Sequence, residues 1–176
     1  MPLNSHKPPL SAALSWRGWQ WSFLIVAVAL SLFSCNRRSL YSHFEPVAAA
    51  GWSHADTLHF TVTPPPVWFA PQVAGRSVLF LNLRTTSAYP YTDLLLFVVQ
   101  RTGSMQRHDT LRLKIADSEG RSLGSGQGLY QHTFRLRGLP IDEDDTLRVD
   151  VVHVMQRSPL PGVIDVGLAL EAEGGG

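Results

Sequence analysis

The chain has 176 residues, which is the length of a single domain. Hydrophobic residues make up 44% of it and charged residues 16%, a balance that excludes a disordered protein, and a formal charge of +1 gives no basis for a nucleic-acid partner. The single cysteine excludes an intramolecular disulfide framework and a zinc site built from several cysteines.

The N-terminus has the pattern of a secretory signal. Residues 1–22 contain two basic residues and no acidic one, and an uncharged apolar run follows over 23–33. Its eleven residues are too few to span a bilayer, which takes about 20. The run ends in Leu32-Phe33-Ser34-Cys35, which resembles the lipobox of bacterial lipoproteins. We therefore expect residues 1–34 to be a lipoprotein signal peptide, with cleavage between Ser34 and Cys35.

Cys35 is then the lipidation site, because its thiol can receive diacylglycerol and its new amine an acyl chain such as palmitate. The alternative is an uncleaved anchor with an incidental cysteine, which the position of the only cysteine disfavours. Two or three acyl chains hold a protein stably on a membrane. We expect no other cofactor. The absence of acidic residues in Asn36-Arg37-Arg38 favours retention in the outer membrane, with the domain facing the periplasm.

The rest of the chain has strand patterns. Residues 35–52 are expected to be a lipidated tether, 53–171 a folded domain, and 172–176 a disordered tail. Within the domain, Leu58, Phe60 and Val62 alternate with polar residues, and the same two-residue period recurs further on. The expected strands are 56–62, 77–83, 92–100, 110–115, 129–136, 146–155 and 163–171. The run 92–100 is apolar throughout, which predicts a strand buried on both faces. In 163–171, the two-residue period places Ile164, Val166, Leu168 and Leu170 on the same face of the expected strand.

No stretch of the expected domain shows a sustained helical period. Seven or eight short strands joined by Gly-, Pro- and Asp-rich turns predict an all-β fold, an antiparallel β-sandwich.

Three groups of residues invite a chemical interpretation, and each has a plainer one. The acidic run 142–145 suggests calcium but lacks the alternating ligands and central glycine of a calcium loop, which favours a solvated turn. The histidines form no HxxxH or HxH pair, so we expect no metal site. The glycine-rich segment 122–128 lacks the Lys-Ser/Thr ending of a phosphate loop and is expected to be a flexible turn.

The aromatic residues are the best contact candidates. Trp52, Trp68, Phe69, Tyr89 and Tyr91 could form a platform for a sugar ring or a patch for a protein partner. A loop packed on the edge of the sandwich is an equally open interpretation of the segment around Trp68. We take Trp68 and the Tyr89-Pro90-Tyr91 turn as candidate partner contacts.

Four segments together resemble the GldH gliding motility lipoproteins of Bacteroidetes. They are Cys35 with Tyr41, Phe44, Gly51 and Trp52; the stretch 82–94 with its Tyr-Pro-Tyr turn; the turn 116–126; and Met155-Gln156 with 160–168. The resemblance covers nearly the whole chain after Cys35. It implies a part in the envelope machinery for gliding, which overlaps with type IX secretion, and it supplies no catalytic residues.

Function is therefore expected to be non-enzymatic. The leading hypothesis is a lipid-anchored accessory protein that contacts the membrane and other gliding or secretion proteins of the envelope, with no nucleic acid and no small-molecule substrate. The second is a module that binds envelope glycan or peptidoglycan. An enzyme is least favoured, because neither a nucleophile–base pair nor a carboxylate pair is evident in the sequence.

Overall fold

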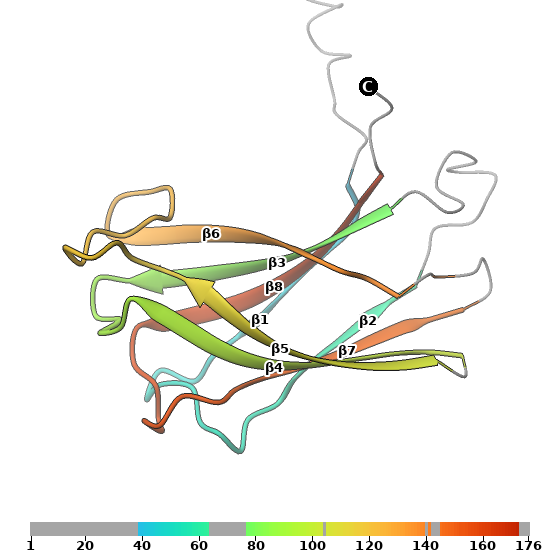
Figure 1. Ribbon diagram of the computed structural model, residues 1–176, viewed down its shortest axis with the longest axis horizontal. Helices are drawn as coiled ribbons and strands as arrows, with labels where there is room; N and C mark the ends of the chain where they lie inside the picture. Colours follow the sequence, from blue (N-terminus) through green and yellow to red (C-terminus); the bar gives the residue numbers. More distant parts are fainter. Residues whose placement is uncertain (1–38, 64–76, 104, 140, 142–144, 173–176) are drawn as a thin grey trace, which may run out of the picture. The chain divides into compact units, whose positions relative to one another are not determined.

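The computed structural model describes residues 39–63, 77–103, 105–139, 141 and 145–172 (Figure 1). Within them the secondary structure is eight β-strands and no helix. The strands are β1 Ser39–Pro46, β2 Leu58–Val62, β3 Ser77–Thr86, β4 Asp93–Thr102, β5 Met105–Lys114, β6 Leu129–Leu136, β7 Leu147–His153 and β8 Val163–Ala172. The all-β prediction is confirmed. The signal peptide lies outside the described residues and stays a prediction.

The strands form two antiparallel sheets of four strands each (Figure 1). One sheet has the order β1-β8-β3-β6 and is called sheet 1 below; sheet 2 has the order β2-β7-β4-β5. Every pairing in the two sheets is antiparallel. The expected β-sandwich is thus confirmed.

The core lies between the sheets and comes from the alternation that the sequence shows. Leu79, Leu81 and Leu83 of β3 are each at most 2% exposed and face Phe60, Leu94, Leu96, Val149 and other inward side chains of sheet 2. Since successive residues of a strand point to opposite faces, polar residues between them reach the outer faces. Trp52 also belongs to this core, with no exposed surface.

The interpretation of 92–100 as buried on both faces is only half right. The inward residues Leu94, Leu96 and Val98 of β4 are buried, but Leu95 and Phe97 on the outer face of sheet 2 are partly exposed. Among the described residues no further layer covers that face. The apolar sequence of β4 therefore belongs to a strand with one buried face and one partly exposed face.

Two further expectations differ from the structure. The tether segment contains β1, which pairs with β8 along its length although its sequence does not alternate cleanly. The phase expected for β8 breaks at Ile164, which is 42% exposed. The β3–β8 ladder shifts register there, between Arg84 and Thr85, and such a bulge turns one side chain outward.

The register sets two opposite ends of the sandwich. At the end that we call the Ser39 end, sheet 1 brings together Ser39, Ala172, Ser77 and Leu136. The amide of Gln100, near the end of β4, bridges to the chain after β6 there, through Arg137 O at 3.0 Å and Leu139 N at 3.1 Å. The opposite end, which we call the Tyr89 end, holds the β3–β4 turn, where Thr86 N bonds to Gly162 O.

Candidate partner-binding pocket

The β3–β4 turn at residues 87–92 is held rigidly at its first aromatic residue. Tyr89 donates its backbone N–H to Thr86 O and its hydroxyl to Asp93 O at 2.8 Å, which closes the turn on itself. Gly162 has a φ of +80° and lies against the backbone of Tyr89, leaving no room for a Cβ. Only glycine fits that position, so the turn is fixed from outside as well.

The second wall of this region is the turn after β5. Ile115 and Ala116 donate their N–H groups to Thr92 O, which ties the two turns together. Asp117 Oδ1 accepts the N–H groups of Glu119 and Arg121, and its Oδ2 accepts Arg121 Nε at 2.8 Å. An aspartate that bonds to the backbone two and four residues on organises a tight turn, as the sequence suggested.

Tyr130 of β6, the register partner of Thr85, completes the enclosure. Together the three segments line a pocket of about 360 Å³ at the Tyr89 end. The lining residues are Thr85, Thr86, Ser87, Tyr89, Tyr91, Ile115, Ala116, Gly120, Arg121, Ser122 and Tyr130. A concave site of this size, with aromatic walls and several hydroxyl groups, has the form of a small ligand or side-chain pocket.

The electrostatics of the pocket are close to neutral. Burial raises the pKa of Tyr89 far above its ordinary value, with Tyr91 and Asp93 adding to the effect, so its hydroxyl stays protonated. Arg121 is the cation of the lining, but it pairs with Asp117 and also with Glu119 at 2.9 Å. The guanidinium hydrogen bond is the main cause that lowers the pKa of Asp117. The pocket therefore suits an uncharged polar ligand better than a strong anion.

The aromatic groups give the pocket its stacking surface. The rings of Tyr89 and Tyr91 meet edge to face with centroids 6.0 Å apart, and Tyr91 is 37% exposed. An exposed tyrosine face binds a sugar ring or a proline ring by apolar contact while its hydroxyl stays in water. Chemically, the site is arranged for binding.

The structure brings together some of the predicted contact residues and not others. Tyr89 and Tyr91 line the pocket, and Pro90 is exposed between them. Trp52 is buried in the core, with its indole N–H donated to Asp56 O at 2.8 Å, so its place in a surface platform was wrong. Trp68 and Phe69 lie outside the described residues, as do Ser34 and Cys35. That Trp68 and the Tyr89 turn contact a partner stays a prediction.

Sequence reasoning missed Thr85 of β3, Arg121 of the turn after β5 and Tyr130 of β6. The sequence placed Tyr130 on a strand, but its position beside Tyr89 follows from the β3–β6 register. No local motif carries that information.

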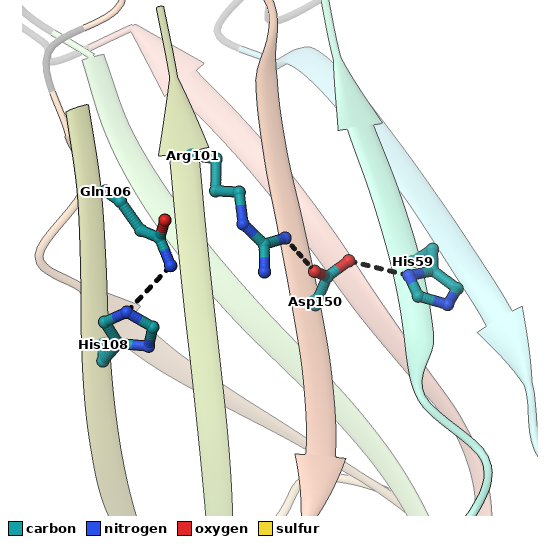
Figure 2. A network of polar contacts seen from close by, with 5 residues as sticks. All are labelled: His59, Arg101, Gln106, His108 and Asp150. Carbon is teal, nitrogen blue, oxygen red and sulfur yellow. Dashed lines mark hydrogen bonds and ion pairs between the residues drawn. The ribbon is translucent and has the colours of Figure 1, made fainter. Parts of the chain in front are cut away.

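A second cluster of titratable side chains lies on the outer face of sheet 2. Figure 2 shows Asp150 between Arg101 and His59, with His59 Nδ1 2.7 Å from the carboxylate, and a separate Gln106–His108 contact of 2.8 Å. His59 is 71% exposed. These residues lie on a sheet surface and none of them lines the pocket, so we treat the cluster as part of that surface.

Other residues were considered for metal or phosphate chemistry, and those in the described part of the chain have structural partners. Asp145 accepts the Thr102 hydroxyl at 3.4 Å, while 142–144 lie outside the described residues. Within the described part of the chain no group of three His, Cys, Asp or Glu side chains is arranged to hold a metal ion. The glycine-rich segment folds between β5 and β6, with Ser125 bonded to Gln131. No helix among the described residues is long and apolar enough to cross a bilayer.

The model of the GldH lipoprotein family matches residues 39–170. The chain belongs to the GldH lipoprotein family. The gliding motility lipoprotein GldH of Flavobacterium johnsoniae is 29% identical to it over 165 residues, covering 85% of this chain and 95% of that protein. Two of the four segments that resemble GldH line the pocket, 82–94 and 116–126, and a third, 160–168, lies against the backbone of Tyr89 through Gly162.

Among solved structures, a family GH115 4-O-methyl-alpha-glucuronidase with specificity for decorated arabinogalactans matches with a TM-score of 0.41 and 11% identity. The match covers 80% of this GldH chain and 18% of the glucuronidase. This chain thus corresponds to less than a fifth of that enzyme's length.

Proposed function

We propose that this GldH family member is a lipid-anchored, non-enzymatic accessory component of the gliding motility machinery of the cell envelope, associated with type IX secretion. In this proposal Cys35 carries the acyl chains, the outer membrane holds them, and the sandwich faces the periplasm. The observation that carries the proposal is the family match over 39–170, directly after the lipobox-like Leu32-Phe33-Ser34-Cys35.

Anchoring favours a role through contact with envelope proteins. A protein held on a membrane meets its neighbours at high effective concentration, so individually weak contacts suffice. The pocket at the Tyr89 end, with Tyr91 exposed at its wall, is the surface that we assign to such contacts.

A threonine hydroxyl and a histidine ring lie together beside the pocket, and their burial supports the proposal that the protein is not an enzyme. Thr85 Oγ1 lies 3.2 Å from His132 Nε2, but the two residues are 1% and 4% exposed. Burial lowers the pKa of His132, which keeps its ring neutral. A nucleophile must reach its substrate. Thr85 lines the pocket, but with only 1% of its surface exposed it offers a bound ligand little access.

A clean deletion in the native bacterium tests the proposal. We expect loss of colony spreading, of the secreted proteome, or of both, restored by the wild-type gene and not by the Cys35→Ser variant. Membrane fractionation of the Cys35→Ser variant shows directly whether Cys35 holds the protein on the membrane. Normal spreading and secretion in the deletion strain would overturn the machinery role.

The pocket also favours a second candidate function, binding of an envelope glycan or peptidoglycan. Three tyrosines, several hydroxyl groups and a neutralised arginine suit an uncharged sugar. Purified envelope polysaccharides should bind the wild-type protein, and Tyr91→Ala and Tyr130→Ala should each weaken binding about tenfold, the value of one lost stacking contact. Met105→Ala, equally exposed but in the opposite β4–β5 hairpin, is the matched control. Equal binding by all variants excludes this site.

A further inference from the structure

The Ser39 end of the sandwich must lie close to the lipid anchor. Only four residue steps separate Cys35 from Ser39, the first residue of β1. A fully extended chain covers at most about 3.5 Å per residue, so the start of β1 stays within roughly 14 Å of the acylated cysteine. This step rests on the proposed lipidation of Cys35.

The strand register decides what else lies at that end. Ser39 pairs with Glu171 of β8, and Ala172 of β8 pairs with Ser77 of β3. Leu79 of β3 pairs in turn with Leu136 of β6. The end of β6 is therefore brought to the same end of sheet 1 as the start of β1.

A basic pocket is present at this corner. It has a volume of about 430 Å³ and is lined by Ser77, Val78, Arg135, Leu136, Arg137 and Gly138. Both arginines are exposed. Guanidinium groups bind phosphate oxygens with two parallel hydrogen bonds, which makes paired arginines suited to phosphate. The sequence adds Arg37 and Arg38 beside the anchor.

We propose that the Ser39 end docks on the membrane surface, with Arg135 and Arg137 bound to anionic lipid headgroup phosphates. The anchor places this end at the bilayer, and the two arginines supply the charge that phosphates attract. The pocket lined by Tyr89, Tyr91 and Tyr130 then points away from the membrane. It stays open to envelope partners, which is the position a binding site on an anchored protein requires.

The lipidated full-length protein in vesicles tests this docking. Since the chain has one cysteine and acylation blocks its thiol, an introduced cysteine can be labelled uniquely. Gly138→Cys marks the Ser39 end, where a Cβ meets only Leu79 at 3.5 Å. Leu123→Cys, at a residue 56% exposed beside the opposite pocket, marks the Tyr89 end. Quenching of each fluorophore by nitroxide-headgroup lipids reports its proximity to the bilayer.

In vesicles that contain phosphatidylglycerol we expect strong quenching at 138 and little at 123. Arg135→Gln and Arg137→Gln should each lower the ratio of docked to undocked protein about fivefold. Vesicles of phosphatidylcholine alone should show the same loss. Arg112→Gln is the matched control, an exposed arginine near the Tyr89 end that does not line the pocket, and it should leave the quenching at both labels unchanged.

The outcomes separate the docking from the anchor. Flotation of wild-type protein and not of Cys35→Ser establishes the anchor, and if both float alike the proposed function fails first. With the anchor established, equal quenching at both labels, or stronger quenching at 123, overturns the orientation. Quenching at 138 that is indifferent to both arginine variants overturns the phosphate contact.

Discussion

The outer faces of the two sheets use the same kind of ion pair in opposite settings. On sheet 1, Arg84 grips Asp165 through Nε, at 2.7 Å from Oδ1, and through a second bond from Nη2. The Phe44 ring lies against Gly167, and the Arg84 guanidinium carbon lies over that ring, 4.6 Å from its centroid. The Asp165 side chain is only 8% exposed.

On sheet 2, Asp150 lies between two basic side chains, His59 and Arg101, and in the described part of the chain no ring lies over the Arg101 guanidinium. Its partners His59 and Arg101 are 71% and 47% exposed (Figure 2). Water competes for each of these groups, and salt screens their charges. We therefore infer that the burial of Asp165 with its partner Arg84 makes the sheet 1 pair more important for stability than the exposed cluster on sheet 2.

Removal of Arg84 should destabilise the protein more than any of the other changes. Arg84→Met leaves the Asp165 carboxylate buried without its partner, and we expect a loss of about 3 kcal/mol in the free energy of unfolding. Arg101→Met is the matched change on sheet 2 and should cost about 0.5 kcal/mol. Urea unfolding of both variants near neutral pH measures the difference. Similar losses in the two variants would contradict the comparison.

The sequence predicted the fold well because the core depends on local alternation. Leu79, Leu81 and Leu83 lie inward as their period requires. β1 was missed because its strand state depends on pairing with β8 and its own pattern is irregular. Ile164 was misplaced because a bulge depends on two strands at once, and one strand's sequence does not show it.

Gly167→Ala should displace the Phe44 ring on sheet 1. The added Cβ would lie 2.5 Å from a carbon of the Phe44 ring, so the ring must shift, which disturbs its contact with Arg84. We expect a loss of about 2 kcal/mol, in the range of an overpacked site. The double variant with Phe44→Ala should be no less stable than Phe44→Ala alone, since the clash is then absent. If the glycine change costs the same in both backgrounds, the ring is not its cause.

The candidate pocket was only partly predictable. Tyr89 and Tyr91 stand out in the sequence because an aromatic-proline-aromatic turn is unusual and interrupts two apolar strands. Tyr130 and Arg121 join them through the β3–β6 register and the Asp117 turn. The opposite arginine pair, Arg135 and Arg137, follows from the same register. Sites assembled across strands need the pairing, which composition and period leave open.

The smallest expected effect is the pH dependence of the stability that Asp150 contributes on sheet 2 with His59 and Arg101. Burial alone would raise the pKa of Asp150, but the hydrogen bonds with His59 and Arg101 outweigh it and hold the pKa below its ordinary value. A depressed folded-state pKa gives stability that is present above the unfolded value of about 3.9 and is lost as the pH falls through the folded pKa. Asp150→Asn should therefore lower stability by about 0.5 kcal/mol at neutral pH and leave it unchanged in strong acid. Thermal unfolding of both proteins across this range measures the gap, and a gap that persists in acid would trace the effect to packing instead of charge.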